Sequence, residues 1–126
     1  LESIITNVSK ISEIRIESTI DQIDDTLSAK TQIHFYRIFQ ELLNNIVKHS
    51  QANLVKISIQ IKRKYIYSIV DDNGKGFNYK QVLLAGPLNS GIGLVNIEER
   101  IKLLGGTLKI SSKPKAGTKI ELKVPI

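Results

Sequence analysis

Apolar residues recur at every third or fourth position in two stretches of the chain. The longer stretch covers residues 29–50, and its apolar positions are Tyr36, Phe39, Leu42, Leu43, Ile46 and Val47. The shorter stretch ends at Gly105 and Gly106, and its apolar positions are Leu94, Ile97, Ile101 and Leu104. This spacing places the apolar side chains on one face of a helix, and glycine commonly ends one. The pattern therefore predicts two amphipathic helices.

Elsewhere apolar and polar residues alternate, which is the period of a half-buried strand. Strands are predicted at residues 12–17, 55–61, 65–70, 108–110 and 120–124. Residues 62–64 and 113–117 are predicted turns, and residues 18–30 and 78–90 are predicted loops, because they lack a period and are rich in polar, glycine or proline residues. A loop as long as residues 78–90 is typical of a lid or binding segment.

These elements predict one α+β domain over residues 1–126, built as a two-layer sandwich. One face of a mixed sheet is expected to be wet, and helices are expected to cover the other. Residues 1–10 have helix-like apolar spacing over a short length and are interpreted as the tail of a preceding helix.

Composition narrows the possible functions. The chain has no cysteine and two histidines, which disfavours disulfides and zinc sites, and no apolar run approaches membrane-spanning length. The net charge of +6 resides in the second half of the chain. The lysines there alternate with apolar residues along strands and lack interleaved aromatics, so they indicate a solvated sheet face and not a nucleic-acid site. The three that show this best are Lys109, Lys119 and Lys123.

The most informative stretch follows the predicted strand at residues 65–70. Asp72 comes at the strand end, and Gly74 and Gly76 follow it. A carboxylate there is a fixed hydrogen-bond acceptor, and glycines allow a flat ligand to approach the backbone, which suits the amino group of adenine. A plain turn has the same composition. An EF-hand loop is excluded by Lys75 and Val82, and a dinucleotide fingerprint by Tyr79.

Each of two further motifs can be interpreted either as part of a binding site or as an ordinary structural feature. A polar stripe along the first helix is either a solvated face or part of a site; it comprises Glu41, Asn45, Lys48 and His49. Gly91 and Gly93 precede the second helix, where free N–H groups would bind phosphate, although many such pairs are only tight turns.

The three motifs together, at residues 41–49, 72–77 and 91–100, closely resemble the ATP-binding catalytic domain of bacterial sensor histidine kinases. They correspond to the asparagine box and the two glycine boxes of that family. The last motif, with its continuation to residue 106, looks like the subfamily that pairs with NarL-type response regulators. The resemblance implies the Bergerat ATP-binding fold, whose sheet is mainly antiparallel.

The resemblance also implies roles in binding the nucleotide. Asp72 would accept a hydrogen bond from the adenine amino group, with Thr118 nearby through water, and Gly74 and Gly76 would leave room for the base. Lys48 or His49 would neutralise phosphate charge. Backbone N–H groups would cradle the β- and γ-phosphates; they belong to Gly91, Ile92, Gly93 and Leu94.

For catalysis, the resemblance assigns Mg²⁺ to Asn45 and polarisation of the attacking nucleophile to Glu41. Phosphoryl transfer needs mainly positioning and charge neutralisation. The family's acceptor histidine lies on a separate dimerisation domain and is followed by an acid, whereas His34 and His49 are not. The chain alone is therefore expected to bind ATP without phosphorylating itself.

The expected partners are the kinase's own dimerisation and phosphoacceptor domain and, for the full-length protein, a NarL-type response regulator, with no nucleic acid. The full-length protein is expected to be dimeric and membrane-anchored, with this domain at the cytoplasmic face. Two alternatives remain: an anti-sigma-type serine kinase of the same fold, and an ATP-binding switch without transfer.

Overall fold

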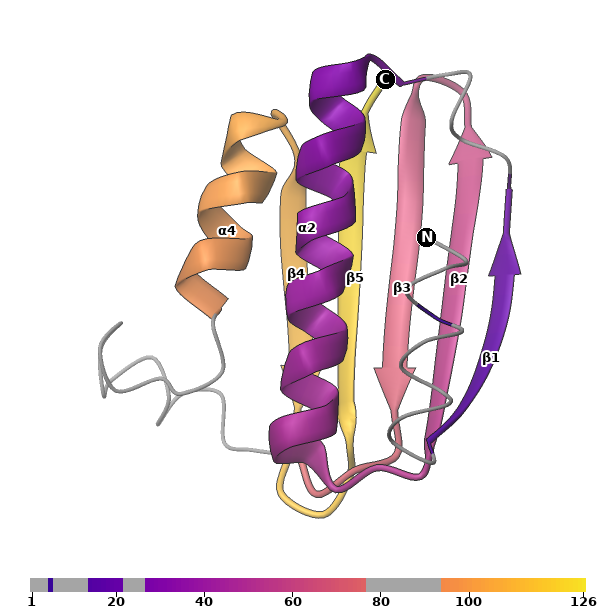
Figure 1. Cartoon of the computed structure of the whole chain (residues 1–126), viewed down its shortest axis with the longest axis vertical. Helices are drawn as coiled ribbons and strands as arrows, with labels where there is room; N and C mark the ends of the chain where they lie inside the picture. The colour runs from indigo at the N-terminus through magenta and orange to yellow at the C-terminus, as the bar shows by residue number, and fades with distance from the viewer. Residues whose placement is uncertain (1–4, 6–13, 22–26, 77–93) are drawn as a thin grey trace.

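The computed structural model describes residues 5, 14–21, 27–76 and 94–126, and within them five strands form one sheet in the order β1-β2-β3-β5-β4. Helices α2 and α4 lie side by side over one face of this sheet (Figure 1). The elements in chain order are β1 (Arg15–Ile20), α2 (Ala29–Asn45), the π-helical turn η1 (Ile46–Ser50), β2 (Leu54–Lys62), β3 (Tyr65–Asp72), α4 (Leu94–Leu103), β4 (Thr107–Ser112) and β5 (Thr118–Pro125). The predicted α+β class is confirmed.

The sheet is mixed, as predicted. β1 pairs with β2 in parallel, while the pairs β2–β3, β3–β5 and β5–β4 are antiparallel. α2 is the crossover connection that parallel pairing of β1 with β2 requires. The hairpin between β2 and β3 turns at Arg63, whose φ is +57°. All described strand neighbours are thus joined by a regular register.

The hydrophobic core lies in a single layer between the helices and the sheet. Strand residues alternate between the two faces, so every second residue of β2, β3 and β5 enters this layer. Burying a large aliphatic or aromatic side chain stabilises the fold by about 1.5–3 kcal/mol. The largest fully buried side chains are Phe35, Phe39, Ile38, Leu42, Leu43, Ile57, Ile59, Ile66, Ile97, Ile101, Leu122 and Val55.

The start of α2 and the end of α4 are each fixed by a local feature of the sequence. Ser28 caps α2, because its Oγ accepts a hydrogen bond from the backbone N–H of Thr31 at 3.2 Å. α4 ends in a Schellman motif at Gly105, whose φ is +72°. There the N–H of Gly105 donates to the carbonyl of Lys102 at 3.0 Å, and the N–H of Gly106 donates to that of Ile101 at 2.9 Å. The predicted glycine stop is confirmed.

The orientation of α2 corrects the sequence prediction. Tyr36 and Val47 were expected on the apolar face, but these residues are 44% and 42% exposed. The buried face instead includes Phe35 and Ile38. Each helical residue advances about 100° around the axis, so a face centred one position earlier excludes Tyr36. Val47 lies in η1, where the wider π-helical turn changes the phase.

The first strand was also predicted wrongly at its end. Residues 18–20 were assigned to a loop, yet they belong to β1 and pair in parallel with Ile57, Ser58 and Ile59. The Asp21 carboxylate then accepts a hydrogen bond from the N–H of Ile61 at 2.9 Å, which extends the pairing. Tertiary pairing therefore overrides a polar local sequence here. The predictions for most of residues 1–13 and for residues 78–90 lie outside the described ranges.

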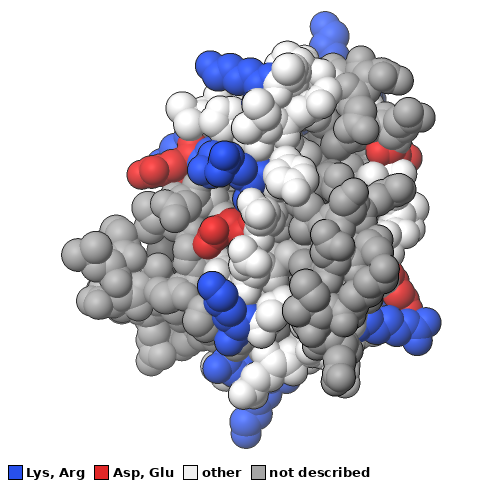
Figure 2. Space-filling view, in the orientation of Figure 1, with Lys and Arg blue, Asp and Glu red and all other residues white. Residues whose placement is uncertain are grey.

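Charged side chains are interspersed on the helix-covered face. Figure 2 shows the basic side chains of the described residues spread along the length of the molecule, with acidic side chains among them. In the part of the chain that the structure describes, no helix is long and apolar enough to cross a membrane.

Candidate functional site

Asp72 is a buried carboxylate at the end of β3. Because successive strand residues face opposite sides, Asp72 points to the helix-covered side with Val70, and the residue is only 6% exposed. Its Oδ1 accepts a hydrogen bond from the backbone N–H of Gly74 at 2.8 Å. The chain thus turns back on the carboxylate directly after the strand and fixes its orientation.

The environment of Asp72 changes its acidity. Burial is the largest effect and raises the pKa of the Asp72 carboxyl above its ordinary value. The N–H of Gly74 opposes this change, the neighbouring Asp71 charge adds to it, and the N–H of Thr118 opposes it again. A ligand that donates a hydrogen bond would favour the charged form. The carboxylate is therefore suited to accept from a bound amino group.

Asp72 belongs to a row of polar residues across three neighbouring strands. Thr118 of β5 lies opposite Asp72, and Ser112 of β4 lies opposite Thr118. Thr118 is buried, with 7% of its surface exposed, and its Oγ1 is 2.8 Å from the Oγ of Ser112. The structure therefore brings together the two residues expected at the base, Asp72 and Thr118. Ser112 was missed, because its chemistry appears only when β4 pairs with β5.

The loop after Asp72 is tied to β2. The Asn73 Oδ1 accepts hydrogen bonds from the N–H groups of Asn53 and Leu54 at 3.0 and 3.1 Å. The Asn73 Nδ2 donates to the Oδ1 of Asn53 at 2.6 Å. Sequence reasoning treated Asn73 as a turn residue and gave no sign of this long-range contact.

The same loop is tied on its other side to the turn between β4 and β5. The N–H of Lys115 donates to the carbonyl of Lys75 at 2.5 Å. Gly76 has a φ of +65°, and a Cβ there would overlap the carbonyl oxygen of Lys113. Close approach of this turn therefore requires glycine at position 76, in addition to the room for a base that the resemblance implies.

Part of the predicted helix stripe lies at the same end of the molecule as Asp72. Figure 1 shows the carboxyl end of α2, which is Asn45, and the end of β3 at the same pole. Glu41 lies one turn before Asn45, and both side chains are half-buried. Lys48 is exposed in η1. This placement suits ligands of a phosphate-bound cation, since amide oxygen is an acceptable Mg²⁺ ligand.

The remaining predicted site residues lie partly or wholly outside the described part of the chain. Gly91, Ile92 and Gly93 are outside it, so the phosphate cradle stays a prediction. Leu94 begins α4, and His49 lies in η1, but the described structure does not extend to either side chain. Within the described ranges, histidine, cysteine and acidic side chains form no cluster of three or more that could hold a metal ion.

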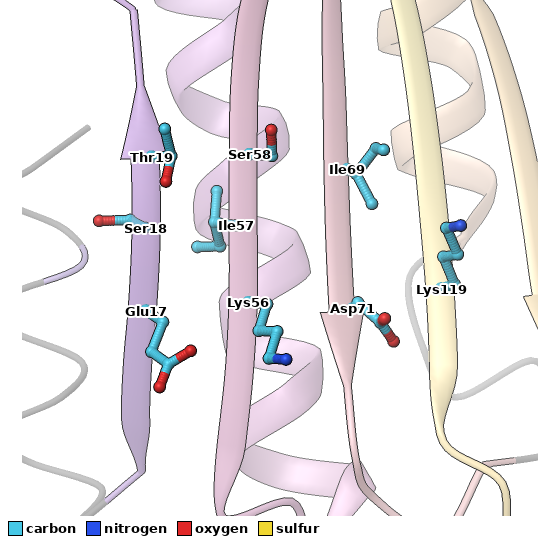
Figure 3. Close-up of a pocket in the computed structure, with 9 residues that line it drawn as sticks. All are labelled: Glu17, Ser18, Thr19, Lys56, Ile57, Ser58, Ile69, Asp71 and Lys119. Atoms are coloured by element: carbon cyan, nitrogen blue, oxygen red, sulfur yellow. The ribbon is translucent and has the colours of Figure 1, made fainter.

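The opposite face of the sheet carries a separate row of charges. Figure 3 shows Glu17, Lys56, Asp71 and Lys119 side by side on β1, β2, β3 and β5, in a shallow hollow of about 330 Å³. Lys119 also pairs with Glu121 at 3.4 Å. Lys123 lies over the ring of Tyr65, with Nζ 4.3 Å from the ring centre. The predicted solvated lysine face is confirmed.

His34 connects the two helices. Its Nδ1 is 3.4 Å from a terminal nitrogen of Arg100, so the side chain lies between α2 and α4 in a partly buried position. His34 is eleven residues before Asn45, which is about 16 Å along a helix at 1.5 Å per residue.

Comparison with known proteins gives a family match over most of the chain. Residues 30–126 match the family described as histidine kinase-, DNA gyrase B-, and HSP90-like ATPase. The matched region begins in the first turn of α2 and includes all of the described residues that were predicted for the site.

Two curated proteins from Bacillus subtilis (strain 168) are similar to this chain. The signal transduction histidine-protein kinase/phosphatase DegS is 34% identical over 103 residues, which are 82% of this chain and 26% of DegS. The sensor histidine kinase LiaS is 38% identical over 120 residues, which are 92% of this chain and 32% of LiaS. The chain thus spans about a quarter to a third of the length of these relatives.

Solved structures share the fold. The blue-light activated histidine kinase EL346 of Erythrobacter litoralis aligns with a TM-score of 0.79 at 17% identity, over 98% of this chain and 40% of that one. The mycobacterial sensor histidine kinase MprB aligns with a TM-score of 0.73 at 19% identity, over 98% of this chain and 90% of that one. The five-stranded sheet with its helical layer is therefore a known architecture.

Proposed function

Because the chain belongs to the family of histidine kinase-, DNA gyrase B- and HSP90-like ATPases, as the catalytic domain of a sensor histidine kinase, we propose that it binds Mg-ATP and donates the γ-phosphate to a histidine on a separate dimerisation domain. Names of relatives such as LiaS support histidine as the acceptor, in preference to the serine of an anti-sigma-type kinase.

The observation that carries the proposal is the buried Asp72 carboxylate. It is held by the N–H of Gly74, lies beside Thr118, and has a pKa raised by burial. Among the described residues no cation forms an ion pair with this carboxylate, and a buried charge without such a partner is costly for the fold. The amino group of adenine would donate to it and offset part of this cost, and Thr118 would contact the base through water.

The phosphates and the metal would lie toward the end of α2. Asn45 would supply an amide oxygen for Mg²⁺, and Lys48 or His49 would help to neutralise the charge of the phosphates. When bound, Mg²⁺ would neutralise charge on the phosphate oxygens. Glu41, one turn before Asn45, would polarise the incoming nucleophile. Backbone N–H groups from Gly91 to Leu94 would cradle the β- and γ-phosphates.

The acceptor and the partners lie outside this chain in the proposal. The acceptor is a histidine of the kinase's own dimerisation domain, and a NarL-type response regulator receives the phosphoryl group in two-component signalling. The relatives are three to four times longer than the matched region, so they have room for such domains. The full-length protein would be a membrane-anchored dimer with this domain on the cytoplasmic side.

Reconstitution tests the transfer step. The chain is mixed with γ-labelled ATP and Mg²⁺, with and without its separately produced dimerisation domain. We expect acid-labile label on the dimerisation domain and none on this chain, because His34 lies between α2 and α4, away from Asn45. Labelling of this chain alone would show that it contains its own acceptor.

The metal assignment has its own test. Asn45→Ala should weaken ATP binding in Mg²⁺ much more than in EDTA, because only the metal-bound nucleotide uses the amide oxygen. Asn44→Ala is the matched control, since Asn44 is the exposed neighbour of Asn45 on α2. Equal losses in Mg²⁺ and EDTA would assign Asn45 a structural role instead.

A further inference from the structure

The end of the molecule opposite Asp72 carries a group of cations. Figure 1 shows the hairpin between β2 and β3 and the end of α4 at this upper end, whereas β3 ends with Asp72 at the lower one. β3 has eight residues, so the two ends are about 23 Å apart along the strand. We call the following set of cations the basic pole: Lys62, Arg63, Lys64, Lys102 and Lys123.

The elements of the basic pole are in contact with one another. The backbone N–H of Ile126, after the end of β5, donates to the carbonyl of Lys64 at 2.8 Å, which joins β5 to the hairpin. A Cβ on Gly105 would lie 3.5 Å from the Cγ of Pro125, so the end of α4 is adjacent to the same strand. The hairpin, the helix end and the strand end therefore form one continuous surface.

The charge of the basic pole is not balanced by nearby acids. Residues 62–64 and Lys102 are exposed, and among the described residues none of them forms an ion pair. Asp21 lies beside the hairpin, but its Oδ2 accepts a hydrogen bond from the N–H of Ile61 at 2.9 Å. On the solvent-exposed face of the sheet, by contrast, cations alternate with acids (Figure 3). The basic pole therefore attracts anions.

Arg63 occupies a backbone conformation that favours glycine. Its φ is +57°, in the left-handed region, which a residue with a Cβ enters at a cost. Lys62 and Tyr65 pair in register, so Arg63 lies at the tip of a tight hairpin. Glycine would suit this turn better, yet the sequence has a cation there. A residue held in such a conformation is a candidate for a role in binding.

Apolar and aromatic side chains accompany these cations. Leu103, the last residue of α4, is 72% exposed. The Nζ of Lys123 lies 4.3 Å from the centre of the Tyr65 ring, so it covers that face of the ring against stacking on a nucleic-acid base. Leucine, tyrosine and lysine together are typical of surfaces that contact lipid, where apolar side chains enter the bilayer boundary and cations meet the headgroups.

From these observations we propose that the basic pole binds an anionic lipid surface, a role that goes beyond the proposed function. A hairpin tip and a helix end are convex and suit a bilayer, whereas a peptide usually binds in a groove or along a strand edge. The cations would lie among the headgroups, and Leu103 would enter the acyl boundary. The end that carries Asp72 would face away from the bilayer and stay accessible to nucleotide.

Co-sedimentation with vesicles tests the proposal. The chain is mixed with vesicles of phosphatidylserine and phosphatidylcholine, or of phosphatidylcholine alone. We expect binding to the anionic vesicles only, decreasing between about 0.1 M and about 1 M salt, because charges are then screened over a shorter distance. Soluble glycerophosphoserine, the same headgroup without acyl chains, should not displace the chain. Equal binding to both vesicles, no binding, or displacement by the soluble headgroup overturns the proposal.

The position of the charge is tested with a triple variant of the hairpin. Lys62→Gln, Arg63→Gln and Lys64→Gln together should weaken vesicle binding by about 100-fold, at about 5-fold for each cation near the surface.

The matched control removes the same net charge from the solvent-exposed face of the sheet. Lys56→Gln, Lys109→Gln and Lys119→Gln together should weaken vesicle binding by less than about 5-fold, because those charges stay farther from the bilayer. Equal losses in the two triple variants would show that only net charge matters and would overturn the proposal.

Two single variants separate lipid binding from folding and from binding of other polyanions. Arg63→Gly should weaken vesicle binding by about 5-fold while raising the urea midpoint, because glycine suits the left-handed φ. Leu103→Gln should weaken vesicle binding by about 5-fold and leave binding to double-stranded DNA and polyglutamate unchanged. Vesicle binding that is insensitive to Leu103→Gln, or tighter binding to either polymer than to vesicles, would assign the surface to an acidic polymer instead.

ATP affinity keeps this proposal distinct from the proposed function. Both triple variants should bind ATP as the wild type does, because the cations lie far from Asp72. A wild-type chain that binds vesicles but not ATP overturns the proposed function alone. A chain that binds ATP but not anionic vesicles overturns the lipid contact alone.

Discussion

Asp71 and Asp72 are adjacent in sequence but lie on opposite faces of β3. Asp71 is exposed and pairs in register with Lys56 on one side and Lys119 on the other. Asp72 is buried, with Val55 on one side and Thr118 on the other. A step of one residue thus separates a carboxylate in an alternating row of solvated charges from a carboxylate in a row without a cation.

The comparison shows that the fold tolerates an unfavourable buried charge at Asp72. Exposed charges in water interact weakly, so the row containing Asp71 contributes little to stability. Burial of Asp72 raises its pKa and opposes its charged form. A carboxylate in that position fits the proposed role in binding a nucleotide better than it fits a role in stability. Substitutions on the two faces should therefore change different properties, nucleotide affinity or stability, and by different amounts.

The largest effect is expected from a substitution that disturbs the backbone beside Asp72 and Thr118. Gly117→Ala introduces a Cβ that overlaps the Asp72 carbonyl oxygen at a left-handed φ of +77°. We expect the free energy of unfolding to fall by about 3 kcal/mol in urea denaturation. Gly105→Ala is the control, with a φ of +72° but its nearest atom, the Pro125 Cγ, at 3.5 Å. It should cost about 1 kcal/mol, and equal losses would refute the role of the close approach.

The next effect concerns nucleotide affinity on the two faces. Asp72→Asn replaces one acceptor oxygen by a donor and should weaken ATP binding by about 1.5–3 kcal/mol, the range for hydrogen bonds to charged groups. Asp71→Asn changes the same chemistry one residue away on the wet face and should leave affinity unchanged. Calorimetry in Mg²⁺ measures both. Unchanged affinity in Asp72→Asn would remove Asp72 from the site.

A third comparison uses pH. The pKa of Asp72 is raised above its ordinary value of 3.8, so between the unfolded and the folded pKa the native state binds more protons than the unfolded one. The contribution of Asp72 to the free energy of unfolding therefore decreases as pH rises through that window, and stays low above it.

Asp72→Asn should lack this decrease and be the more stable protein at neutral pH, although we expect it to bind ATP more weakly. The measurement is the difference in unfolding free energy between wild type and variant, from about pH 3 to about pH 8. Asp71→Asn provides the control for the loss of a carboxylate. A difference for Asp72→Asn that does not grow with pH would contradict the assignment.

The smallest effect is expected from substitutions on the solvent-exposed face of the sheet. Lys56→Ala removes one cation from the exposed row and should change the free energy of unfolding by less than about 0.5 kcal/mol. ATP affinity should not change, because Lys56 faces away from Asp72 across the sheet. A large loss of affinity would indicate that the two faces are coupled.

The sequence was sufficient for those features whose cause is local. Alternation along residues 55–61 and 65–70 predicted both strands, with Asp72 at the end of the second, and Gly105 predicted the end of α4. Features that depend on pairing partners were not accessible. The strand at residues 18–20 exists because β2 lies beside it, and a polar sequence alone gives no such signal.

The candidate site shows the same division. Asp72 was predicted from its position at a strand end, and Thr118 only from the family resemblance. Ser112 was not found, because serine in a polar turn-rich region is unremarkable until β4 and β5 bring it within 2.8 Å of Thr118. Tyr36 was placed on the wrong face because a one-residue shift of the buried stripe fits the apolar spacing almost equally well.

The anchoring of residues 73–76 has a consequence for how binding energy is divided. Asn73 is fastened to β2, and Lys75 and Gly76 are fastened to the turn between β4 and β5. The backbone that follows Asp72 is therefore held on both sides. The contributions of base and triphosphate to affinity should then be nearly additive, as for independent sites. In the proposed ATP site, a small adenine-like fragment would retain the full base contribution, and this end of the sheet would then suit inhibitors without phosphate.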